Sequence, residues 1–147
     1  MFTETLISTF VIIRMKAAAQ TEPCSSRAII QEVFQLKKIA IFAFRGDPLC
    51  FMHVMLNALD MKAKEIEVKV ILEGESVKLI QAMQTSGNKL FQKMQDQGLI
   101  DCVCKACSAK MGVLEYNQTS GIRLADEMSG HPAMATYLEM GYEIIMQ

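Results

Sequence analysis

Four segments of the chain are rich in apolar residues, and the segments between them repeat with a helical period. The apolar segments are residues 39–44, 66–72, 99–104 and 142–146. A nearly continuous apolar run is what a strand buried on both faces requires. Residues 49–62 place apolar side chains at the i, i+3, i+4 spacing of an amphipathic helix. Strands that alternate with helices pair in parallel through right-handed crossovers. The pattern therefore predicts a three-layer α/β/α sandwich with a mainly parallel sheet of four or five strands.

Turn and capping residues divide the remaining chain into further elements. Asp47 is placed to cap the helix over residues 49–62, with Pro48 at its first position. Ser86 is expected to cap a helix that ends at Gly98, and a short helix over 105–111 is expected to stop at Gly112. After a polar loop over 115–120, the pattern predicts one or two helical turns over 122–128 and a helix over 129–140 that leads to the last strand.

Composition narrows the class of protein without naming a function. The 147 residues carry a formal charge of −1, and the basic residues are scattered, which gives no electrostatic reason to expect nucleic acid or membrane partners. Five cysteines form no regular framework. A domain of this size folds without disulfide bridges, so we expect a reducing, cytoplasmic setting in which clustered cysteines do chemistry.

The first 36 residues are treated as an N-terminal extension, with the α/β domain over residues 37–147. Residues 6–13 are apolar and precede three alanines, as in a signal peptide. However, Glu4 stands where positive charge is expected, and the apolar run is too short to span a bilayer. Met15 offers an alternative start. A helix over residues 27–36 is also expected in this extension.

Three of the five cysteines lie within six residues, at Cys102, Cys104 and Cys107. The apolar run ends at Cys104, so this residue is predicted at the carboxyl end of a strand, with Cys107 in the first turn of the next helix. The N-terminus of a helix stabilises an anion, and Lys105 adds a positive charge, so we expect a thiol here with a pKa below the ordinary value of about 8.5. Such a thiolate serves as a nucleophile or as a metal ligand.

The same cysteines admit other interpretations. Cys102, Cys104 and Cys107 can bind zinc or an iron–sulfur cluster, with Cys50 or His53 as the fourth ligand if the first and third strands are neighbours. A thioredoxin-like dithiol is a further option, although the usual Trp and Pro around that motif are missing. Taken singly, Cys102 is more simply explained as buried core. His53 taken singly is predicted on the helix surface or partly buried, and His131 is predicted at the surface.

The motif over residues 101–113 and the order of elements resemble the DsrE/DsrF-like family of sulfur-relay proteins, which includes YchN-like and TusD-like members. In that family a strand ends in a cysteine and a glycine follows eight residues later, as Cys104 and Gly112 do. The YchN-like branch often has a second cysteine at the position of Cys107. The resemblance covers residues 37–147. It implies a flavodoxin-like sandwich that forms homo-trimers or homo-hexamers.

The resemblance also implies a function. Cys104 would carry a persulfide and pass its sulfane sulfur from a donor protein to the thiol of an acceptor protein, with no cofactor. Cys107 would be able to resolve the persulfide into a disulfide. Two alternatives remain open at this point: a metal-binding module, and a non-catalytic α/β oligomer in which the cysteines only pack.

Overall fold

The computed structural model describes residues 37–147, which form five parallel strands with helices on both faces of the sheet. The strands are β1 (Lys38–Ala43), β2 (Glu67–Leu72), β3 (Ile100–Cys104), β4 (Leu124–Ala125) and β5 (Glu143–Met146), and the sheet order is β4-β3-β2-β1-β5. The predicted three-layer α/β sandwich is therefore confirmed. The predicted helix over 27–36 and the extension that contains it lie outside the described residues.

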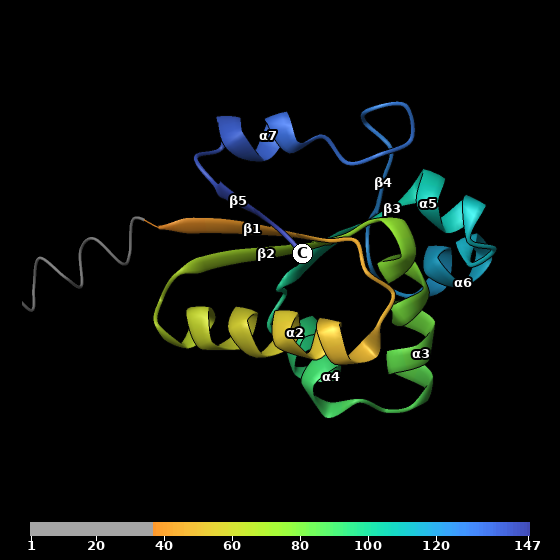
Figure 1. Cartoon of the computed structure of the whole chain (residues 1–147), viewed down its shortest axis with the longest axis horizontal. Coiled ribbons are helices and arrows are strands. Elements are labelled where there is room, and N and C mark those ends of the chain that lie inside the picture. Colours follow the sequence, from red (N-terminus) through yellow and green to blue (C-terminus); the bar gives the residue numbers. More distant parts are fainter. Residues whose placement is uncertain (1–36) are drawn as a thin grey trace, which may run out of the picture.

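Most helices cover one face of the sheet. They are α2 (Pro48–Ala63), the 3₁₀ helix η1 (Gly74–Lys78), α3 (Leu79–Thr85), α4 (Lys89–Asp96), α5 (Lys105–Lys110) and α6 (Leu114–Thr119). The chain moves in one direction across the sheet from β1 to β4, so right-handed crossovers put these helices on the same side. In Figure 1, α2, α3 and α4 lie together below the strands, and α5 and α6 lie at the right-hand end of the sheet. Their apolar side chains form the larger core with every second residue of β1 and β2.

The last crossover returns across the whole sheet and covers the opposite face. It carries α7 (Met134–Glu139), which lies alone on the other side of the strands from α2 and α4 (Figure 1). A smaller core lies beneath it, including Phe42, Ile71, Cys102 and Tyr137. The chain thus leaves β3 toward one face and β4 toward the other. In parallel sheets, ligands bind at the carboxyl ends of strands where the connections diverge in this way.

Capping explains where the long helix begins, and it corrects one boundary. Asp47 accepts hydrogen bonds from the N–H groups of Leu49 and Cys50, as predicted for an N-cap. The predicted cap at Ser86 is wrong: Asn88 caps α4 by accepting from the N–H groups of Leu90 and Phe91. Ser86 instead follows the end of α3.

Three predictions in the last third of the chain are wrong. Residues predicted as a polar loop form helix α6, because Asn117 faces inward and is fully buried. The predicted helical turns over 122–128 contain strand β4, which pairs with the end of β3 and is too short to show an alternating pattern. The predicted helix over 129–140 begins only at Met134.

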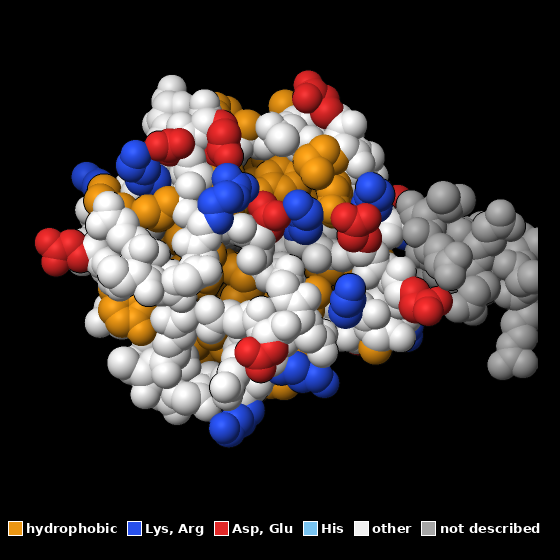
Figure 2. Space-filling model, turned by 180° about the vertical axis from the view of Figure 1, so that it is seen from behind, with side chains coloured by type: hydrophobic (Ala, Val, Ile, Leu, Met, Phe, Trp, Pro, Cys, Tyr) orange, Lys and Arg blue, Asp and Glu red, His pale blue; other side chains and the backbone are white. Residues whose placement is uncertain are grey.

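Charges on the back of the molecule are mixed rather than gathered by sign. Figure 2 shows acidic and basic side chains alternating across this face, with apolar areas exposed between them. On strand β3, Asp101 pairs with both Lys69 and Arg123. Within residues 37–147, none of the helices combines the length and apolar character needed to cross a bilayer.

Candidate functional site: a buried thiol beside His131

Cys104 is the last residue of β3 and also the N-cap of α5. Its φ of −65° and ψ of 121° are extended, so the strand passes directly into the helix. The N–H of Cys107 donates to Cys104 Sγ at 3.3 Å, which makes the sulfur the capping acceptor. Ser108 donates to the carbonyl of Cys104 at 2.7 Å and is held in turn by Asn117. The strand-to-helix junction predicted from the sequence is present, and buried polar groups fix its backbone.

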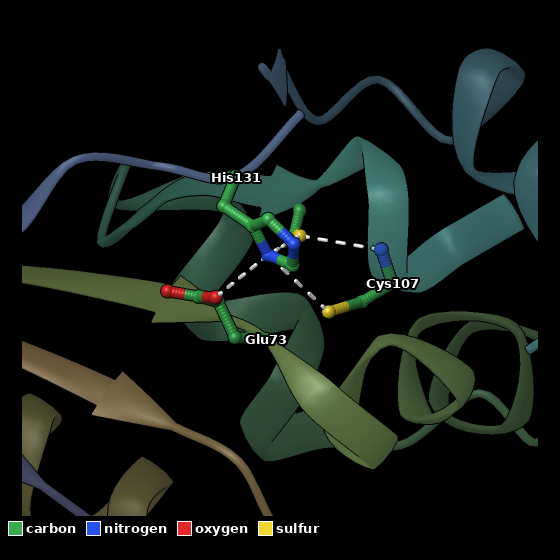
Figure 3. Close-up of side chains that lie close together, drawn as sticks. Glu73, Cys107 and His131 are labelled. Atoms are coloured by element: carbon green, nitrogen blue, oxygen red, sulfur yellow. Dashed lines mark hydrogen bonds and ion pairs between the residues drawn. The ribbon is translucent and has the colours of Figure 1, made fainter. Parts of the chain in front are cut away.

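His131 and Glu73 complete a group of four side chains around this sulfur. His131 Nδ1 lies 3.2 Å from Cys104 Sγ, 3.8 Å from Cys107 Sγ and 3.4 Å from Glu73 Oε2. One ligand atom from each of the four residues lies within 4.8 Å of the others. Figure 3 shows the imidazole with Glu73 on one side and Cys107 on the other. The prediction that His131 is simply a surface residue is wrong.

A tight turn brings His131 to the thiol. Met128 and His131 exchange backbone hydrogen bonds of 2.8 and 3.0 Å. The two residues between them, Ser129 and Gly130, both have positive φ, 52° and 93°, as in a type I′ turn. The N–H of Ala106 donates to the Gly130 carbonyl at 2.8 Å, which ties the turn to the first residues of α5.

Glu73 reaches the site from the end of β2. Its N–H donates to the carbonyl of Ala43 at 2.9 Å, which continues the pairing of β2 with β1 by one residue. Only 9% of its side chain is exposed. Burial raises the pKa of the Glu73 carboxyl, and the nearby His131 offsets part of that rise. Glutamate in a turn after a strand is normally a surface residue, so the sequence carries no signal for this placement.

Burial, rather than the helix terminus, dominates the acidity of Cys104. The buried position raises the pKa of the Cys104 thiol above its ordinary value, and the hydrogen bond from the Cys107 N–H only partly offsets this. The expected lowering of the pKa is therefore wrong. The expected contribution of Lys105 is also absent, because its ammonium group pairs with Asp126 at 2.7 Å. The thiol lies 3.5 Å from the Gly130 carbonyl and 3.2 Å from His131 Nδ1, and this nitrogen can accept the thiol proton in the tautomer that leaves it unprotonated.

Cys102 is separated from the other two cysteines by the sheet. Successive side chains of a strand point to opposite faces, so Cys102 packs in the smaller core under α7 while Cys104 packs in the larger one. Its Sγ lies 3.4 Å from the hydroxyl of Tyr137, and burial raises the pKa of the Cys102 thiol to about 11. Its interpretation as core fits this position, and its place in a shared metal site with Cys104 and Cys107 does not.

Cys50 and His53 also lie apart from the four-residue group. Strand β2 lies between β1 and β3, so the condition on which these residues were expected to converge with Cys104 is not met. Both instead line a separate hollow with Phe44, Arg45, Met146 and Gln147. Among the described residues, the group of possible metal ligands contains neither of them.

An open hollow of about 440 Å³ adjoins the four-residue group. Glu73 and His131 are its polar lining residues, and the rest of the wall is apolar, with Phe44, Met128 and Met134 among its side chains. Met128 is 55% exposed. The imidazole is therefore reached from solvent across an apolar surface.

The fold and the site define a small parallel α/β protein with a cysteine at the carboxyl end of strand β3, which lies between β2 and the edge strand β4. Residues 19–146 match the DsrE/DsrF-like family, and the chain belongs to that family. The family match begins within the segment assigned to the N-terminal extension. Membership implies a sulfur-relay role in general terms.

Two archaeal relatives have no characterized function. The chain is 35% identical over 97 residues to an uncharacterized protein of Methanocaldococcus jannaschii, covering 64% of this chain and 77% of that protein. It is 38% identical over 40 residues to an uncharacterized protein of Archaeoglobus fulgidus, covering 27% of this chain and 66% of that one. No solved structure gives a significant match.

Proposed function

We propose that the protein is a sulfur carrier that holds a sulfane sulfur on Cys104 as a persulfide and passes it to the thiol of a partner protein. The observation that carries the proposal is the 3.2 Å approach of His131 Nδ1 to Cys104 Sγ at the carboxyl end of β3. Family membership supports the same chemistry. Burial disfavours an isolated thiolate, but transfer of the thiol proton to the imidazole forms an ion pair without net charge, and the attraction within the pair offsets part of that cost.

The loading step is a thiol exchange. The Cys104 thiolate attacks the outer sulfur of a donor persulfide, R–S–SH, so that a bond forms between Sγ and that sulfur while the bond within the donor breaks. The products are Cys104–S–SH and the donor thiolate, R–S⁻. Unloading is the same exchange with an acceptor thiolate, which takes the outer sulfur and leaves the Cys104 thiolate. No external oxidant or reductant is consumed in either step.

Cys107 provides a second route out of the loaded state. Its Sγ belongs to the group whose atoms lie within 4.8 Å of one another, so it can approach Cys104 Sγ with a small movement. Attack of the Cys107 thiolate on Cys104 Sγ forms a disulfide and expels HS⁻. An external dithiol, or two thiols in succession, must then reduce that disulfide. This route limits the lifetime of a persulfide that finds no acceptor.

The apolar hollow beside His131 is the proposed docking place for the donor and the acceptor. A segment of a partner that presents a cysteine among apolar residues would cover Met128 and exclude water from the sulfur transfer. We further propose that the protein works in a reducing compartment, in keeping with the free cysteines of the described chain.

Exposed apolar residues on α2 support a homo-oligomer as part of the same proposal. Leu49, Met52 and Leu56 follow an i, i+3, i+7 spacing on one side of the helix and are 36–70% exposed. Ile145 and Met146 are exposed on β5, an edge strand. Exposed apolar side chains that gather on one element mark interaction sites. A trimer or hexamer would bury it.

Intact mass measurement tests the loading step. The reduced full-length protein is incubated with a sulfane-sulfur donor such as polysulfide and then freed of it. We expect a gain of about 32 mass units that dithiothreitol reverses. Cys104→Ser must lose the gain, and Cys50→Ser, which alters a cysteine outside the group, must keep it. Sulfur loading that survives in Cys104→Ser contradicts the proposal.

A further inference from the structure

We infer that Glu73, Cys104, Cys107 and His131 form a binding site for Zn²⁺ when both thiols are reduced. This set differs from the cysteine set considered from the sequence, since it takes only Cys104 and Cys107 from that set. It draws on three separate parts of the fold: the end of β2, the β3–α5 junction and the turn after β4. The inference goes beyond sulfur carriage and does not depend on it.

The three distances from His131 Nδ1 to the other ligand atoms are close to those of a tetrahedral site. Zinc bonds of about 2.0–2.3 Å put neighbouring ligand atoms about 3.3–3.8 Å apart. His131 Nδ1 lies 3.2, 3.4 and 3.8 Å from the ligand atoms of Cys104, Glu73 and Cys107. All four atoms lie within 4.8 Å of one another, so small side-chain rotations bring them onto one ion.

The chemistry of the four donors favours zinc. Two thiolates, one imidazole and one carboxylate are all established zinc ligands, and sulfur with nitrogen selects against Mg²⁺ and Ca²⁺. The sulfurs and the carboxylate all approach the same ring nitrogen. A single proton on Nδ1 interacts with only part of this group, whereas a divalent cation contacts every member. Binding releases the thiol protons to solvent.

The site is both supported and accessible. The hydrogen bond from Ala106 to Gly130 joins the β3–α5 junction to the turn after β4, and the hydrogen bond from Ser108 to Cys104 fixes the junction itself. Glu73 and Cys104 are buried, while Cys107 and His131 are partly exposed and open a path for the ion. Partly buried ligands on several well-packed segments are what a site with fixed geometry requires.

Zinc and sulfane sulfur compete for the same atom. A persulfide on Cys104 places an extra sulfur where the ion binds, and a bound ion removes the free thiolate that attacks the donor. Zinc would therefore keep the thiols reduced and block loading until the ion is removed. Metal and sulfur occupancy should be mutually exclusive on each chain.

Zinc titration of the full chain tests this inference. The protein is reduced, stripped with a chelator and titrated with Zn²⁺ against a chromophoric zinc indicator, and Co²⁺ provides a spectrum that reports thiolate coordination. We expect one ion per chain and a Co²⁺–thiolate charge-transfer band. Cys104→Ser, Cys107→Ser and His131→Ala should each weaken binding by more than the roughly 10–100-fold typical of an outer-shell change. Cys50→Ser and His53→Ala are the matched controls and should bind as the unaltered protein does.

Each outcome separates the metal site from sulfur carriage. The zinc site is overturned if the unaltered protein does not bind one zinc ion per chain. It is also overturned if the Co²⁺ spectrum lacks the thiolate band, or if Cys50→Ser loses as much affinity as Cys104→Ser. Sulfur loading measured on the metal-free sample then judges the carrier function independently. Loading that proceeds unchanged with zinc bound also overturns the inference, because the two occupants require the same sulfur.

Discussion

Cys104 Sγ lies 3.2 Å from His131 Nδ1, although 27 residues separate them in the sequence. The β3–α5 junction supplies the sulfur, and the tight turn that follows β4 in the sequence supplies the imidazole. This pairing means that the reactivity of the thiol depends on the position of one loop as well as on its own junction.

Replacement of His131 should make Cys104 less reactive. Without the imidazole, the buried thiol must release its proton to water, and each unit by which its pKa rises lowers the thiolate population about tenfold. We expect His131→Ala to slow the alkylation of Cys104 by iodoacetamide about tenfold or more at neutral pH. Mass spectrometry measures the rate of this alkylation. His53→Ala alters the other histidine, which is exposed and outside the group, and should leave the rate unchanged. Equal slowing in both variants would contradict the assignment.

Gly130 should set the position of His131. A Cβ at this residue would lie 3.0 Å from Ala106 Cβ, so Gly130→Ala must push the turn away from α5. Gly141 also has a positive φ, 83°, but a Cβ there meets no atom within 4 Å. Both substitutions cost about 1–2 kcal/mol of left-handed strain, measured by chemical denaturation. Only Gly130→Ala should also slow the alkylation of Cys104, and an unchanged rate would show that the turn does not position the imidazole.

Asp101 should contribute to the loss of stability in acid. Burial opposes its ionisation, but hydrogen bonds from Lys69, Tyr137 and Arg123 outweigh burial and lower the pKa of Asp101. The Asp101 carboxylate therefore binds a proton more readily in the unfolded chain than in the folded one. The stabilisation from ionised Asp101 is present above about pH 4 and is lost as the pH falls through its lower, folded-state pKa.

Denaturation of Asp101→Asn between pH 2 and 7 tests this contribution. The variant should be less stable than the unaltered protein at neutral pH, and the difference should shrink as the pH falls below about 4. Asp60→Asn removes an exposed ion pair with Lys64 and should change the free energy of unfolding by less than about 1 kcal/mol. A difference between Asp101→Asn and the unaltered protein that is constant across the pH range would contradict the assigned pKa shift.

The proposed oligomer depends on the exposed face of α2. Leu49 is 70% exposed, so Leu49→Glu should not disturb the core of a single chain. We expect light scattering to show a mass of several chains for the unaltered protein and a smaller mass for Leu49→Glu, because a charge buried in an apolar interface is costly. Glu115→Gln on the exposed part of α6 serves as a control. A single-chain mass for the unaltered protein would exclude this assembly.

The sequence predicts well those features that depend on local pattern. Apolar segments predict strands β1, β2 and β3, and the end of the third segment at Cys104 locates the thiol. Spacing along one helix also places Asp47 at its N-cap. These features are decided within a few residues, where side-chain period and backbone capping act directly.

His131 and Glu73 depend on contacts between segments that are distant in the sequence. The incorrect prediction of a helix over residues 129–140 meant that His131 was not expected in the site. The dipeptide Ser129-Gly130 was the available signal, since Ser-Gly marks turns, and positive φ at both residues directs His131 back to the sheet. Glu73 offers no such signal, because its burial follows from the turn after β4 folding over the end of β2. Cys50 lies apart from Cys104 because β2 is placed between β1 and β3 in the sheet. The order of strands in a sheet cannot be deduced from the pattern of any single strand.

The central claim is that Cys104 itself holds the transferable sulfur, and site mapping of the loaded protein tests this most directly. The protein is loaded with polysulfide, blocked with an alkylating agent and digested, and the fragment that carries Cys102, Cys104 and Cys107 is sequenced by mass spectrometry. The predicted result is an added sulfur of about 32 mass units on Cys104. Cys102 and Cys107 should carry the blocking group without added sulfur. Added sulfur confined to Cys107 or Cys102, or none on this fragment, would contradict it.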